Sequence, residues 1–154
     1  MPAGYSGTPL PKKLGLADGM TVAYLDAPEH LESLLVPPPA DLTIRTSARG
    51  RLDLAMLFVT SAATLRRRLG STGRAIYPAG MLWIAWPKRS SGVATDVTED
   101  TVREVALPTG LVDTKVCAID ETWSGLRLQW RTQLRDAGSA AAASAAWAAT
   151  SADG

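Results

Sequence analysis

The residues best suited to chemistry begin at the turn after an apolar segment at 20–25. This turn carries Asp26, Glu29 and His30. Carboxylates and imidazole rings accept protons, bind cations and ligate metals. One interpretation is therefore that the turn recognises a cationic or hydroxyl-bearing ligand. The other is structural: the carboxylates cap a helix predicted at 29–35, and His30 is a partly exposed residue at the start of that helix.

The same turn lacks the glycines of a nucleotide-binding loop. Such a loop lets backbone N–H groups approach a phosphate at the start of a helix. Here Pro28 has no N–H to donate, and the carboxylates of Asp26 and Glu29 would repel a phosphate. The next predicted strand ends at 45–47, which contains no carboxylate for a ribose diol. The sequence therefore argues against a dinucleotide or phosphate site, and we expect no cofactor.

Two further loops carry polar and aromatic residues, one after the apolar segment 81–86 and the other after 111–119. Because the carboxyl ends of parallel strands meet at one edge of a sheet, we expect both loops to open on the same crevice as the first turn. The structural alternative is that the tryptophans pack in the core and that Lys88 pairs with Asp120 or Glu121. The candidate ligand-binding residues are Asp26, Glu29, His30, Trp86, Lys88, Ser91, Asp120, Glu121 and Trp123.

Other chemistries lack the residues that they would need. There is no Gly-x-Ser-x-Gly motif, and a serine–histidine–acid triad would have to use His30, the only histidine. The only cysteine, Cys117, lies within an apolar segment and is expected in the core. No ligand spacing supports a metal site around His30. We therefore expect no catalytic residue and no metal.

Composition argues against several classes of partner. The chain has 16 basic and 15 acidic residues and a net charge of +1, so nothing indicates a nucleic-acid surface, and Arg66–Arg68 is interpreted as a solvated helix face. No apolar run approaches the ~20 residues of a membrane span. The N-terminus shows no signal-peptide pattern, so we expect a cytoplasmic protein without membrane contact. The expected partner is a small molecule, and both a monomer and a homodimer remain open.

Apolar strands that alternate with helices indicate a three-layer, Rossmann-like α/β fold. Its sheet should be mostly parallel with an antiparallel edge strand at 126–131, because only about six residues separate the last two strands. The strand at 42–47 is either short or antiparallel, since about four residues join it to the strand at 52–60. The predicted divisions are a Gly/Pro-rich N-terminal arm with a short helix (1–20), the Rossmann-like domain (21–134) and an Ala/Ser-rich tail (135–154). We expect the tail to be disordered, with a frayed helix as the alternative.

Specific motifs are distributed over most of the chain: Ala3-Gly4-Tyr5-Ser6, Pro9-Leu10, Lys13-Leu14-Gly15, Leu25-Asp26-Ala27-Pro28, Trp86-Pro87-Lys88, Ser91-Gly92, Thr95-Asp96 and the run from Val112 to Leu126. Through these motifs, residues 3–131 resemble a family of small bacterial proteins catalogued as a domain of unknown function. The resemblance implies a small Rossmann-like fold and no assigned activity. The layout is also distantly similar to class I methyltransferases, because the stretch 52–86 looks like the second half of such a domain.

These observations favour a non-catalytic module that binds a small ligand or a partner through the loops at the carboxyl edge of the sheet. A first alternative is a degenerate S-adenosylmethionine-dependent, methyltransferase-like enzyme. A second alternative is an oligomerising structural protein that uses the tail and the last strand as contacts.

Overall fold

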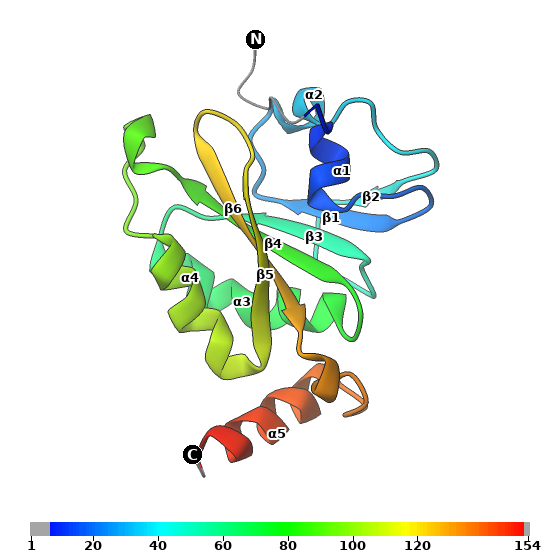
Figure 1. The fold of residues 1–154 in the computed structure, drawn as a ribbon, viewed down its shortest axis with the longest axis vertical. Coiled ribbons are helices and arrows are strands. Elements are labelled where there is room, and N and C mark those ends of the chain that lie inside the picture. The colour runs from blue at the N-terminus through cyan, green and yellow to red at the C-terminus, as the bar shows by residue number, and fades with distance from the viewer. Residues whose placement is uncertain (1–6, 153–154) are drawn as a thin grey trace.

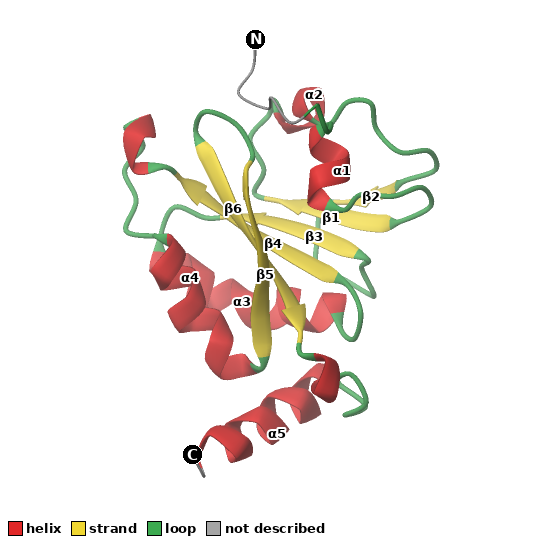
Figure 2. Ribbon diagram, in the orientation of Figure 1, coloured by secondary structure: helices red, strands yellow, loops and turns green. Residues whose placement is uncertain are grey.

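A computed structural model describes residues 7–152 and shows a six-stranded sheet with helices on both faces (Figures 1 and 2). The strand order is β2-β1-β3-β4-β6-β5. The strands are β1 (Thr21–Leu25), β2 (Thr43–Arg45), β3 (Leu54–Phe58), β4 (Met81–Pro87), β5 (Leu111–Ala118) and β6 (Trp123–Trp130). The helices are α1 (Leu10–Leu14), α2 (Leu31–Leu34), α3 (Ala62–Ile76), α4 (Glu99–Ala106) and α5 (Ala140–Ala152). The first six residues of the predicted N-terminal arm, with the motif Ala3–Ser6, lie outside the described residues.

The sheet confirms the predicted Rossmann-like α/β class. Strands β1 to β4 pair in parallel, and β6 is antiparallel to both β4 and β5. One detail differs from the prediction, because the antiparallel strand is not at the edge. Leu126 of β6 pairs with Ile84 of β4 on one side and with Val116 of β5 on the other, so β5 is the edge strand. The alternation of apolar and polar residues reports which face of a strand is buried, not whether both of its backbone edges are paired.

The length of the second strand explains how it can run parallel although few residues join it to the third. β2 has only three residues and runs parallel to β1, with Ile44 opposite Val22. A strand this short leaves residues 46–53 to return the chain to the start of β3. The short-strand alternative is therefore correct.

Two apolar cores lie on opposite faces of the sheet. Successive side chains of a strand point to opposite faces, and β3 divides in this way. Ala55 and Leu57 join the core under α3 and α4, whereas Met56 and Phe58 join the core under α1 and α2. On the second face the fully buried Trp83 donates a hydrogen bond from Nε1 to the backbone oxygen of Leu14, 2.8 Å away, and so fixes α1 against β4.

The two long helices on the first face start at hydroxyl caps. Ser61 caps α3 and accepts a hydrogen bond from the N–H of Thr64. Thr98 caps α4 and accepts a hydrogen bond from the N–H of Thr101. Asp96, two residues before Thr98, accepts from the N–H of Ala62 at 2.8 Å and therefore stabilises the start of α3.

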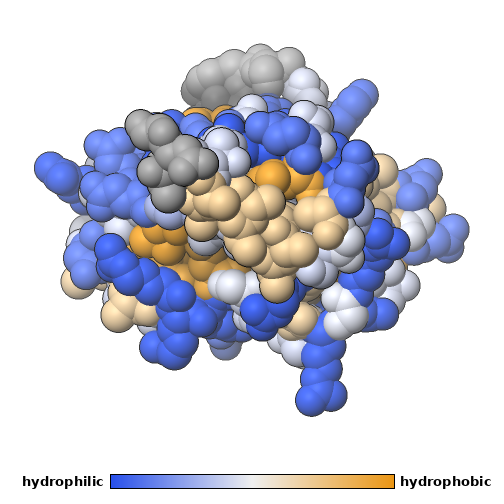
Figure 3. Space-filling view, turned by 90° about the horizontal axis from the view of Figure 1, so that it is seen from below, coloured by the Kyte–Doolittle hydropathy of each residue, from blue (hydrophilic) through white to orange (hydrophobic). Residues whose placement is uncertain are grey.

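The Ala/Ser-rich tail contains α5, whereas the sequence favoured disorder there. Polyalanine has high intrinsic helix propensity, and tertiary contacts add to it. Ala140 and Ala143 are buried, and the guanidinium of Arg131 lies 4.0 Å from the ring centroid of Trp147. Figure 3 looks onto this end of the molecule, where exposed alanines give α5 a weakly hydrophobic outer surface. None of the helices within residues 7–152 has the length and apolar character that a bilayer span requires.

Candidate functional site

The first turn and the last hairpin meet at the carboxyl edge of the sheet. Nε2 of His30 lies 2.9 Å from Oδ2 of Asp120, although 90 positions separate the two residues. The carboxylate is mostly shielded, with 15% of the Asp120 side chain exposed, and the His30 side chain is half exposed. The structure therefore brings together two of the loops that the sequence placed at one edge.

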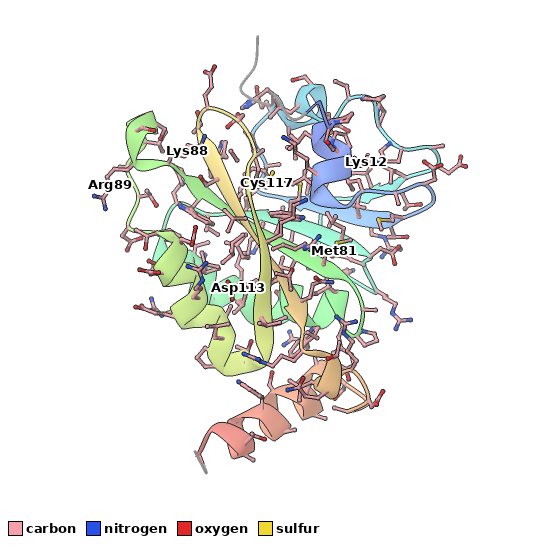
Figure 4. The ribbon with its side chains drawn as sticks, viewed as in Figure 1. Lys12, Met81, Lys88, Arg89, Asp113 and Cys117 are labelled. Carbon is pink, nitrogen blue, oxygen red and sulfur yellow. The ribbon has the colours of Figure 1, made fainter. Side chains whose placement is uncertain are left out.

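The third loop joins the other two through Lys88. Figure 4 shows Lys88 beside the β5–β6 hairpin and Arg89 pointing away from it. Nζ of Lys88 donates to the backbone oxygen of Asp120 at 2.7 Å, and the backbone N–H of Lys88 donates to the oxygen of Thr122 at 2.7 Å. The sequence left a pairing of Lys88 with a carboxylate open, but the acceptor is a carbonyl. Lys88 therefore holds the hairpin rather than offering its charge to a ligand.

Asp120 is fixed on both carboxylate oxygens. Oδ1 accepts from the backbone N–H groups of Thr122 and Trp123 at 2.8 and 2.7 Å, and Oδ2 faces His30. Burial by itself would raise the pKa of Asp120, but the hydrogen bonds from His30, Trp123 and Thr122 outweigh burial and hold the pKa below its usual value. Asp120 therefore stays ionised as an internal acceptor.

Three other predicted residues of these loops have structural roles. Trp86 is 6% exposed and belongs to the core under α3 and α4. Trp123 packs edge-to-face on Phe58 with ring centroids 5.0 Å apart. Ser91 donates to the oxygen of Lys88 and closes the turn after β4. The packing alternative for the two tryptophans therefore describes the structure.

Asp26 does not cap the following helix. It has a left-handed backbone (φ +54°) and forms an ion pair with Arg68 of α3. The N-cap of α2 is His30, which makes no capping hydrogen bond through its side chain. Neither Asp26 nor Glu29 thus fills the capping role that the sequence offered as the structural alternative.

A groove, which we call the β1–β2 groove, lies where the carboxyl ends of β1 and β2 meet α2. Its outer cavity has a volume of about 190 Å³ and its inner cavity about 120 Å³. The outer cavity is lined by Tyr24, Ala27, Pro28, Glu29, Leu31, Glu32, Ile44, Arg45 and Thr46. The inner cavity is lined by Leu16, Tyr24, Glu32, Leu35, Val36, Pro38, Pro39, Leu42 and Ile44.

Of the nine predicted site residues, Glu29 alone lines this groove. The remaining eight lie outside its lining, and Glu121 is exposed on the hairpin. Sequence reasoning missed Tyr24 and Glu32. The sequence held a weak indication of both: Tyr24 is the one aromatic residue of the apolar segment 20–25 and ends in a hydroxyl, and Glu32 follows Glu29 by three positions, about one helical turn.

Three polar groups of the groove have no hydrogen-bond or ion-pair partner in the described part of the chain. Among residues 7–152, no hydrogen bond or ion pair is found for the carboxylates of Glu29 and Glu32 or for the hydroxyl of Tyr24. Burial, with a smaller contribution from the charge of Glu32, raises the pKa of Tyr24 to about 12. Two free carboxylates beside a protonated phenol suit a ligand that carries positive charge and hydroxyl groups.

The described residues contain no cluster of three or more histidine, cysteine, aspartate or glutamate side chains that could hold a metal ion. His30 and Asp120 are in contact at the carboxyl edge, but two ligands do not make a closed metal site.

The fold is similar to solved S-adenosylmethionine-dependent methyltransferases. A methyltransferase of this class from Aquifex aeolicus superposes with a TM-score of 0.57 at 16% identity, covering 76% of this chain and 85% of the other. The magnesium protoporphyrin IX methyltransferase from Synechocystis, solved with S-adenosylmethionine bound, superposes with a TM-score of 0.50 at 10% identity, covering 79% and 74%. No family model and no curated protein matches the sequence.

These similarities establish a methyltransferase-like Rossmann fold, in agreement with the distant similarity expected from the sequence. They give no support to the non-catalytic interpretation that the sequence favoured. Its first alternative, a degenerate S-adenosylmethionine-dependent, methyltransferase-like enzyme, agrees better with the fold that these structures share with this chain.

Proposed function

We propose that the chain is a methyltransferase-like protein that binds S-adenosylmethionine in the β1–β2 groove through side chains instead of a glycine-rich loop. The observation that carries this proposal is the presence of free carboxylates, on Glu29 and Glu32, in a cavity at the carboxyl edge of a methyltransferase-like sheet. Ligands of open α/β sheets bind at this edge.

The lining residues have the chemistry that this ligand needs. The sulfonium and ammonium cations suit the carboxylates of Glu29 and Glu32, and the carboxylate of the ligand suits the guanidinium of Arg45. The exposed side chain of Ile44 and the ring of Pro28 offer apolar contact. The absence of a phosphate cradle is no obstacle, because S-adenosylmethionine has no phosphate. Once bound, it would supply an electrophilic methyl group.

The outer cavity is smaller than the roughly 300–1,000 Å³ of pockets that enclose drug-sized ligands, since its volume is about 190 Å³. It therefore has room for the charged end of the cofactor only, and the rest would lie over the exposed carboxyl edge. A ligand held in this way keeps part of its surface in water, and we expect a dissociation constant in the micromolar to millimolar range, about −4 to −8 kcal/mol.

Isothermal titration calorimetry tests the proposal. S-adenosylmethionine should release or absorb heat, S-adenosylhomocysteine should bind more weakly because it lacks the sulfonium charge, and ATP should not bind because the carboxylates repel phosphates. Glu29→Gln and Glu32→Gln should each weaken binding by about fivefold, as expected for a partly exposed charge pair.

Glu104→Gln is the matched control, because Glu104 is exposed on α4 and lies outside the groove. The proposal is wrong if millimolar S-adenosylmethionine gives no heat, or if both groove variants bind it as the native protein does.

A further inference from the structure

The inner cavity of the β1–β2 groove has a mostly apolar lining, most of which lies outside the outer cavity where the proposed function places the cofactor. Val36 and Ile44 both line it and are 57% and 46% exposed. They are two of the four large hydrophobic residues exposed in the described part of the chain, together with Val93 and Val116. Exposed apolar side chains gathered at a hollow mark a binding site more strongly than the same residues scattered singly.

The size of the inner cavity limits what it can hold. Its volume is about 120 Å³. An apolar cavity of roughly 150 Å³ in another protein holds one benzene molecule. The inner cavity therefore has room for one aromatic ring or a branched aliphatic group of similar size, and its open side leaves space for a substituent.

The only charge in the lining of the inner cavity is negative. Glu32 is the only charged residue of its lining, and the hydroxyl of Tyr24 is the other side-chain polar group there. No lysine, arginine or histidine lines it. An apolar body with one cationic or hydrogen-donating end complements this set, whereas a carboxylate or phosphate would meet Glu32 without a counter-charge.

The two cavities adjoin at Tyr24, Glu32 and Ile44, which line both of them. A polar end that reaches Glu32 from the inner cavity therefore points toward the outer cavity, where the proposed function places the cofactor. From this juxtaposition we infer that the inner cavity binds a small primary amine with an aromatic or branched apolar body, and that this amine is the methyl acceptor.

The transfer step rests on the proposed function. The amine first loses a proton to solvent. Its lone pair then forms the bond to the methyl carbon while the carbon–sulfur bond breaks, and the electron pair of that bond stays on sulfur. The products are the methylated ammonium, which can release its proton to solvent, and S-adenosylhomocysteine. No oxidant, reductant or further reactant is needed.

Benzylamine is a suitable probe, and benzyl alcohol is its neutral counterpart. Saturation-transfer NMR and calorimetry on the full chain should show that benzylamine binds about tenfold more tightly than benzyl alcohol. The ammonium of benzylamine donates a charged hydrogen bond to Glu32, whereas the hydroxyl of benzyl alcohol donates a weaker one from a neutral group. Glu32→Gln should remove this difference. Val36→Ser should weaken the binding of both probes about threefold by removing apolar contact. The control Val116→Ser, at a valine of β5 that is 52% exposed against 57% for Val36, should leave the binding of both unchanged.

A second measurement adds S-adenosylmethionine and detects N-methylbenzylamine and S-adenosylhomocysteine by mass spectrometry. Formation of both in equal amounts supports the acceptor role. If S-adenosylmethionine binds but benzylamine does not, the inference is wrong and the proposed function stands. If benzylamine binds as expected but S-adenosylmethionine does not, the proposed function and the transfer step fail while the amine subsite stands. Binding of both without methylation overturns the acceptor role, and equal binding of benzylamine and benzyl alcohol overturns the charge recognition.

Discussion

Nε2 of His30 and Oδ2 of Asp120 lie 2.9 Å apart and join the turn after the first strand to the turn before the last. Asp120 in turn accepts two backbone N–H groups of its own hairpin and is held by Lys88 through its carbonyl oxygen. Asp120 therefore connects three loops at the carboxyl edge of the sheet, and removing the charge of its carboxylate should have a measurable cost in stability.

Asp120→Asn should lower the free energy of unfolding at pH 7 by about 1 kcal/mol, because it replaces a charged acceptor by a neutral one of the same shape. The pKa of Asp120 is held below its usual value of 3.8 in the folded state. The stabilisation is therefore present above pH 3.8 and is lost as the pH falls through the folded pKa. Urea titrations between pH 7 and pH 2 should show the free energies of unfolding of the native protein and of Asp120→Asn converging at the acid end. The control Glu121→Gln, on the same hairpin, should have the stability of the native protein throughout. A constant gap over the whole range would contradict this account.

The stability of the protein should depend more on which residue occupies position 26 than on the ion pair between Asp26 and Arg68. Arg68→Ala should cost no more than about 1 kcal/mol, because the Asp26 carboxylate of the pair is 58% exposed and screened by water. Asp26→Val should cost about 1–2 kcal/mol, since the left-handed backbone at φ +54° disfavours a β-branched residue, whereas Asp26→Gly relieves that strain. Arg67→Ala serves as the control on the exposed side of the helix. Thermal denaturation measures the loss of stability in each variant, and a larger loss in Arg68→Ala than in Asp26→Val would contradict this prediction.

Tyr24 should make stability fall at high pH. Its pKa is raised from 10.0 to about 12 in the folded protein by burial and by Glu32. The stabilisation is therefore complete below pH 10 and is lost as the pH rises through about 12. The free energy of unfolding of the native protein should fall between these pH values relative to that of Tyr24→Phe, which has no group to ionise there. Denaturant titrations measure the difference, and a pH-independent difference would show that Tyr24 titrates as a solvated phenol.

Helix α5 should depend on Trp147. The stacking of Arg131 on the indole ring and the burial of Ala143 are its main contacts with the rest of the protein, together with a hydrogen bond from Ser144 to the backbone oxygen of Thr109. Trp147→Ala removes a cation–π contact of about 0.5–2 kcal/mol as well as apolar packing. Amide hydrogen exchange in α5 should accelerate at least about tenfold while β3 and β4 keep their protection. The exposed-site variant Ala146→Ser should change neither region, and unchanged exchange in Trp147→Ala would mean that helix propensity alone holds α5.

The sequence predicted most of the secondary structure because that structure is local. Apolar runs indicated four of the strands, and alternating apolar and polar residues at 42–47 and 126–131 indicated the other two. The sequence pattern could not predict which of β5 and β6 lies at the edge of the sheet. Whether Leu126 has one neighbouring strand or two depends on which backbone edges meet in space, and the side-chain pattern is the same in both cases.

The carboxylates show what the sequence determines and what only the tertiary structure determines. The sequence by itself determined that a turn without glycine, with Asp26 and Glu29, follows the first strand, and so that a phosphate would be repelled there. Only the tertiary structure decided which carboxylates are already occupied: Asp26 by Arg68, 42 positions away, and Asp120 by His30, 90 positions away. It left Glu29 and Glu32 free at a groove made by two parallel strands and a helix. The physical reason is that a charge is neutralised by the groups a few ångströms from it, and chain folding, not spacing along the sequence, sets those distances.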